Sequence, residues 1–90
     1  MKPSDKLSRL RADLAVNKQD MESNMKRAAD AAEFIAKTMK KINEDPAHAH
    51  FHYSIIGLTY VERERHLARA EAAYKYCLTF REQIRTLQKE

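Results

Sequence analysis

The chain has 90 residues, of which one is glycine and two are proline, and its formal net charge is +4 at pH 7. This length permits one small domain, and a chain with so little glycine cannot form the glycine-rich loops that bind phosphates. The charge is evenly spread, because 10 basic and 8 acidic residues precede Pro46 whereas 7 and 5 follow it. An extended basic tail of the kind that binds nucleic acid is therefore excluded.

A single cysteine, Cys77, excludes a disulfide framework and favours a reducing, cytoplasmic location. No apolar run approaches the roughly 20 residues that a membrane-spanning helix requires. We therefore expect a cytoplasmic protein that has no membrane partner.

The segment 43–46, Asn-Glu-Asp-Pro, is the strongest interruption in a sequence rich in helix-forming residues. Pro46 disfavours the helical conformation of Asp45, so one helix should end before it, and Asp45 with Pro46 can begin the next. Either Ser4 or Asp5 can cap the first helix. The sequence thus predicts an all-α fold, a single domain over residues 1–90 that forms a long antiparallel two-helix hairpin. Its parts are a helix at about 4–43, a turn at 44–46 and a helix at about 46–88.

Apolar residues recur every seven positions along the first predicted helix. Such a heptad repeat places them on one face and is typical of a coiled-coil seam. The repeat consists of Leu7, Leu14, Met21, Ala28, Ile35 and Ile42.

A second heptad repeat follows the turn, and we interpret it as the seam of the second helix. It consists of Tyr53, Tyr60, Leu67 and Tyr74, with a companion row of Ile56, Arg63, Ala70, Cys77 and Ile84. In an antiparallel hairpin centred on the turn, facing residues have numbers that sum to about 91. This register predicts three pairs: Leu14 with Cys77, Ile35 with Ile56, and Asn24 with Leu67.

The second helix is apolar over more than one stripe, which is more than a single partner helix can cover. Exposed apolar patches of that kind mark contacts between molecules. We therefore expect a homodimer or a higher homo-oligomer, assembled into a helical bundle. The expected interface residues are Ile55, Leu58, Tyr76 and Phe80.

Two histidines after the turn have a spacing that can chelate a metal. His48 and His52 lie four residues apart and share one helix face. No second histidine pair or cysteine completes such a site, so we expect surface histidines and no cofactor. Metal binding by these two residues remains a third functional alternative.

A basic and aromatic cluster on the second helix offers a different chemistry. Guanidinium groups next to aromatic rings are used to bind nucleotides and other anions. The alternative is that Arg63, placed on the seam, sets the register, and that its side chain either extends to the rim or pairs with Glu62 or Glu64 across a dimer. The candidate ligand-binding residues are Tyr60, Arg63, Arg65, His66, Arg69 and Tyr74.

No Ser/His/Asp or Cys/His arrangement is evident, so we expect a protein that is not an enzyme and has no catalytic residues. The leading hypothesis is a small helical adaptor or inhibitor that binds another macromolecule, with a protein as its partner. Bacterial and phage accessory factors are often of this kind. The alternative is an oligomer that binds an anionic ligand such as a nucleotide or nucleic acid.

Overall fold

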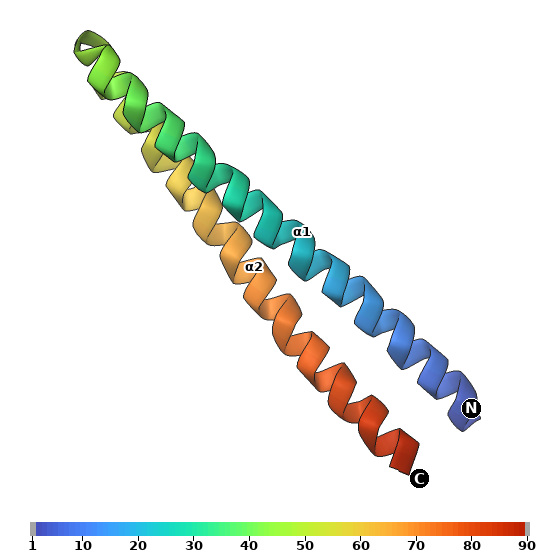
Figure 1. Ribbon diagram of the computed structural model, residues 1–90. Coiled ribbons are helices and arrows are strands. Elements are labelled where there is room, and N and C mark those ends of the chain that lie inside the picture. The colour runs from blue at the N-terminus through green and yellow to red at the C-terminus, as the bar shows by residue number, and fades with distance from the viewer. Residues whose placement is uncertain (1, 90) are drawn as a thin grey trace.

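A computed structural model describes residues 2–89 and shows two long helices packed side by side (Figure 1). Helix α1 spans Pro3–Glu44, a short 3₁₀ turn η1 spans Pro46–His48, and helix α2 spans Ala49–Lys89. The two helices are antiparallel, so the blue N-terminal end and the red C-terminal end lie at the same end of the rod. The predicted all-α helical hairpin is therefore confirmed.

The start of α1 differs from the sequence expectation. Pro3 is the first helical residue and Lys2 occupies the N-cap position, without a side-chain hydrogen bond to the helix. Proline is favoured there because its missing N–H would have no partner in the first turn and its φ is already helical. Ser4 and Asp5, the expected caps, lie inside the helix, where Asp5 contributes a negative charge to the first turn.

The reversal between the helices centres on Asp45. Its φ of −137° leaves the helical region, while its N–H still donates to the carbonyl of Lys41 at 2.8 Å. Pro46 then begins η1, and the carboxylate of Asp45 contacts Nδ1 of His48 at 2.7 Å. This side-chain contact accompanies a backbone hydrogen bond from the N–H of His48 to the carbonyl of Asp45 at 3.2 Å, and α2 begins only at Ala49.

The seam of α1 follows the predicted heptad repeat, and a second row runs beside it. The members of both rows are buried or half-buried, which is the spacing of a coiled coil. The predicted row is Leu7, Leu14, Met21, Ala28, Ile35 and Ile42, and the second row is Leu10, Asn17, Asn24, Ala31 and Thr38.

The seam of α2 lies one row away from the expected one. Tyr53, Tyr60 and Tyr74 are 60%, 54% and 48% exposed, so the tyrosine repeat faces outward. The predicted companion row faces α1 instead, and its members Ala70 and Cys77 are buried. The observed seam rows are Ile56, Arg63, Ala70, Cys77 and Ile84, and His52, Thr59, His66, Ala73, Phe80 and Leu87.

Apart from Leu10, the most deeply buried side chains between the helices are small or polar. Ala28, Ala73 and Thr38 are each 3% exposed, and Asn24 is 5% exposed. Buried hydroxyls are satisfied within their own helix, since Thr38 Oγ1 donates to the carbonyl of Phe34 at 2.9 Å. Among the residues that the structure describes, no buried side-chain nitrogen or oxygen lacks a hydrogen-bond partner. Small residues let the helices approach closely, but little apolar area is removed from water.

The outcome is a thin rod and not a compact domain. Its principal extents are 67 × 17 × 13 Å, and its radius of gyration is 20.0 Å, against about 12 Å for a globular chain of this length. Neither helix, within residues 2–89, is long and apolar enough to cross a membrane. Many large apolar side chains of the described residues therefore remain on the outside of a narrow two-helix structure.

Candidate functional site

Beyond the seam, each helix presents further rows on both sides of the hairpin, because successive residues turn by about 100°. On one side, the rows next to the seam are apolar from Met25 to Met39 in α1 and from Tyr53 to Tyr74 in α2. Met25 and Met39 of α1 are 54% and 55% exposed, close to the values of the tyrosines. We name this surface the methionine–tyrosine face. It comprises Met25, Ala32 and Met39 of α1 and Tyr53, Tyr60, Leu67 and Tyr74 of α2.

A shallow groove of about 450 Å³ runs along the methionine–tyrosine face. Side chains from both helices line it, so rows of α1 and α2 do meet on one side of the rod. Its single charged member is Glu71, which pairs with Lys75 at 3.4 Å. The lining residues are Met21, Met25, Leu67, Ala70, Glu71 and Tyr74.

The opposite side combines apolar and charged groups, and we name it the mixed face. Leu58 is 75% exposed, more than any other large apolar side chain in residues 2–89, and Phe51 is 63% exposed. The charged groups lie between apolar patches. The mixed face comprises Arg27, Asp30 and Phe34 of α1 and Phe51, Ile55, Leu58, Glu62, Arg65, Arg69 and Tyr76 of α2.

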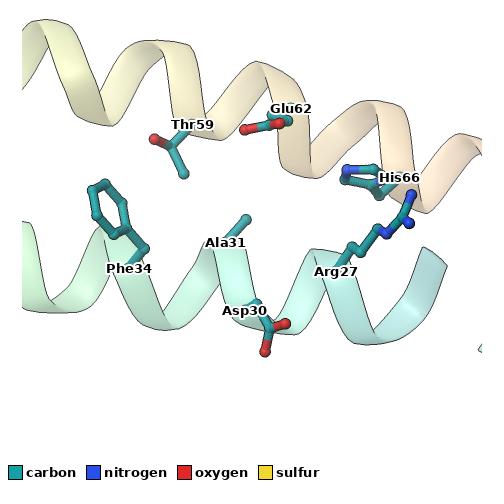
Figure 2. A pocket seen from close by; sticks show the side chains of 7 residues that line it. All are labelled: Arg27, Asp30, Ala31, Phe34, Thr59, Glu62 and His66. Carbon is teal, nitrogen blue, oxygen red and sulfur yellow. The ribbon is translucent and has the colours of Figure 1, made fainter. Parts of the chain in front are cut away.

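A groove of about 580 Å³ opens on the mixed face. Figure 2 shows Arg27 of α1 and His66 of α2 close to each other at one end of it, and Phe34 and Thr59 at the other. Glu62 lies between them on α2, whereas the carboxylate of Asp30 points away from α2. Basic, acidic and aromatic side chains thus line one open surface.

A hydrogen-bonded polar layer joins the helices beneath this groove. Nδ1 of His66 lies 3.0 Å from Oδ1 of Asn24, across the seam. The amide nitrogen of Asn24 donates to the backbone carbonyl of Asp20 at 2.9 Å and to its carboxylate at 3.1 Å. Because that nitrogen is the donor, the Asn24 oxygen must accept, and His66 donates from Nδ1–H. This pairing fixes the orientation of both side chains and the register of the helices at one level of the rod.

The structure does not bring the candidate ligand-binding residues to one place. Tyr60 and Tyr74 belong to the methionine–tyrosine face, whereas Arg65 and Arg69 belong to the mixed face. His66 lies on the seam and is engaged by Asn24. Arg27 of α1, which the sequence did not indicate, is the cation that lies beside His66.

Arg63 reaches from the seam to the surface. Its guanidinium donates to Oε1 of Glu64 at 3.0 Å, and its central carbon lies 6.0 Å from the ring centroid of Tyr60. The side chain is 33% exposed, so its charge is solvated and neutralised locally. This geometry corresponds to the structural alternative in which the Arg63 side chain extends to the rim, and the glutamate that it contacts is the adjacent Glu64 of the same chain.

The expected interface residues also divide between surfaces. Leu58 and Tyr76 are exposed on the mixed face, and Ile55 beside them is half-buried. Phe80 is half-buried in the same seam row as Ala73 and therefore turns toward α1.

His48 and His52, the candidate metal ligands near the turn, are not joined by further side chains that could complete a metal site in the described part of the chain. His48 contacts Asp45, and within residues 2–89 no group of three or more histidine, cysteine or acidic side chains could hold a metal ion. Cys77 is 1% exposed on the seam, where a thiol acts as a small apolar side chain.

Comparisons with known proteins give no relative: no family model, no curated protein and no solved structure matches the chain. The two features that the sequence did not reveal are the Asn24–His66 pair and the position of Arg27. One signal was available, because the numbers of Asn24 and His66 sum to 90, within one of the predicted register.

Proposed function

We propose that this hairpin is a non-enzymatic adaptor or inhibitor that acts by binding another protein through its mixed face. The observation that carries the proposal is the exposure of Leu58, whose large apolar side chain is 75% exposed. Phe51, seven residues earlier on the same helix face, is also exposed. Leaving such groups in water costs free energy that a partner would recover, and patches of this kind mark interaction sites.

The charges of the mixed face favour a specific partner protein. Interfaces between proteins that also exist apart combine apolar anchors with a polar rim, and the rim selects the partner. Arg27 and Glu62 flank the groove, while Phe34 offers an aromatic surface within it. A partner that presents complementary charges around an apolar anchor would fit this arrangement.

The test uses a photo-crosslinking amino acid at Leu58, in cells that naturally make the protein, and the same amino acid at Ala68 as control. Ala68 is an exposed residue of α2 outside both named faces. We expect a discrete adduct from position 58 only. The captured protein, once purified, should bind the wild-type hairpin, lose at least about tenfold in affinity for Leu58→Glu and keep its affinity for Ala68→Glu. Equal binding by both variants would contradict the proposal.

A second candidate function, binding of an anionic ligand, is favoured by the position of Arg27 beside His66. Against it, Glu62 lines the same groove, and its carboxylate would repel an anion. We therefore expect no heat of binding when mono-, di- and cyclic nucleotides and short DNA and RNA are titrated by calorimetry at low salt.

A contrary result would be binding that weakens steeply with added salt and disappears in Arg63→Ala, since charge neutralisation would then drive it. If Arg63 is only structural, the same variant changes thermal stability or oligomeric state and has no ligand to lose.

A further inference from the structure

We propose that the methionine–tyrosine face is the docking site for a second copy of this chain. The two hairpins would pack face to face about a two-fold axis parallel to the rod, with both turns at the same end, and form a four-helix bundle. This inference goes beyond the proposed function, which concerns the opposite side of the hairpin.

The exposed area indicates that the isolated rod is incomplete. Its accessible surface is 6981 Å², whereas a globular monomer of 10.5 kDa exposes about 5,400 Å². The difference, roughly 1,500 Å², exceeds the area of about 800 Å² that each partner buries in an interface of standard size. Covering the apolar rows of one face would therefore bring the surface close to that of an ordinary folded protein.

The methionine–tyrosine face is complementary to itself under this symmetry. Because numbers that sum to about 91 mark equal height in the hairpin, Ala32 lies level with Tyr60, Met25 with Leu67 and Met39 with Tyr53. A two-fold axis along the rod sets α1 of one copy against α2 of the other at equal height. Each small Ala32 then receives a large Tyr60 from the second copy, which is the large-to-small packing that helix bundles require.

The position of the apolar stretch, in the half of the α1 row nearer the turn, favours this arrangement over the one with the turns at opposite ends. In the row that contains Met25 and Met39, the preceding members are Arg11 and Lys18. With the turns at opposite ends, α1 would lie on α1, and Lys18 would fall near Met25 of the second copy. With the turns together, the apolar stretch of one copy meets that of the other, and Lys18, level with Tyr74, comes within about one helical turn of Glu71 of the second copy. Arg11 and Arg81 fall level only toward the end of the rod that holds both termini.

The first experiment measures the mass of the assembly and tests which face forms the interface. We expect sedimentation equilibrium of the wild-type protein to report a dimer at micromolar concentration. Tyr60→Glu should weaken association by about 30-fold or more, because it places a charge at the centre of an apolar contact. The matched control is Leu58→Glu, two residues away on the mixed face, which should leave the dimer intact. Circular dichroism checks that both variants remain helical.

The second experiment distinguishes whether the two turns lie at the same end or at opposite ends of the dimer, without altering the interface. Spin labels are placed at Lys40→Cys in a Cys77→Ala background, after its mass and helicity are shown to match the wild type. With the turns together, the two labels lie roughly 20–30 Å apart, across the bundle. With the turns at opposite ends, they lie about 50 Å or more apart along the rods.

Three results would overturn the inference: a folded wild-type monomer at micromolar concentration, dissociation by Leu58→Glu with Tyr60→Glu still dimeric, or the long label distance. Failure of this inference leaves the partner-binding proposal standing, because the crosslinking test probes the opposite face.

Discussion

An Ala73→Leu variant is expected to unfold at a markedly lower urea concentration than the wild type. Ala73 is 3% exposed on the seam, so a leucine there has no room unless the helices separate locally. Overpacking of this kind costs about 1–3 kcal/mol, a large share of the roughly 5–15 kcal/mol that stabilises a small domain. Urea denaturation followed by circular dichroism measures the change in the free energy of unfolding.

The matched control for this variant is Ala68→Leu, five residues earlier in α2 and exposed. The two substitutions add the same side chain to the same helix, and only the seam position should respond. The control should change stability by less than about 0.5 kcal/mol, as surface substitutions usually do. Equal effects at both positions would contradict the observed placement of the seam.

The second large effect is expected for Asn24→Ala, which removes the partner of His66. The Nδ1–H of His66 donates to Oδ1 of Asn24 at 3.0 Å, and Asn24 is 5% exposed. Removing the acceptor leaves a donor without a partner on the seam, which costs about 1–3 kcal/mol. The measurement is again urea denaturation, with His66→Ala and the double variant completing a double-mutant cycle.

Replacing both residues tests what the polar layer does. An Asn24→Leu, His66→Leu variant removes donor and acceptor together, so its stability should equal or exceed that of the wild type. We expect the double-leucine variant to adopt more than one register between the helices, since a single polar layer fixes the alignment of coiled-coil helices. Broadened or doubled NMR signals from seam residues would reveal this loss, and one sharp set of signals would argue against such a role.

The hairpin itself could be predicted from the sequence because its signals are local. Pro46 forces a break at the midpoint, and the apolar heptad of α1 marks its inner face directly. The seam of α2 could not be identified in the same way. Of its two inner rows, the one with Ala70 and Cys77 was predicted as a companion row. The other contains Thr59 and His66, so hydrophobicity favoured the tyrosine repeat, which lies outside.

The candidate site was less predictable because it depends on contacts between the two helices. A shift of one residue in register decides whether Asn24 faces Leu67 or His66, and no local pattern specifies that shift. Arg63 does lie on the predicted row, but its long stem carries the charge out to Glu64, a contact that periodicity does not specify. Sequence periodicity places a residue on a helix face but does not say where a flexible side chain ends.

The single reversal at Asp45–Pro46 has a consequence for how the chain folds. Every contact between α1 and α2 spans this turn, so the loop that must close grows steadily from Ile42 and Ala49 to Leu7 and Ile84. The entropy cost of closing a loop rises with its length, so pairing of the two helices near the turn costs the least entropy. Helix pairing can then propagate from the turn toward the termini. Hydrogen exchange should therefore report the slowest opening near the turn, with protection declining toward the end where both termini meet.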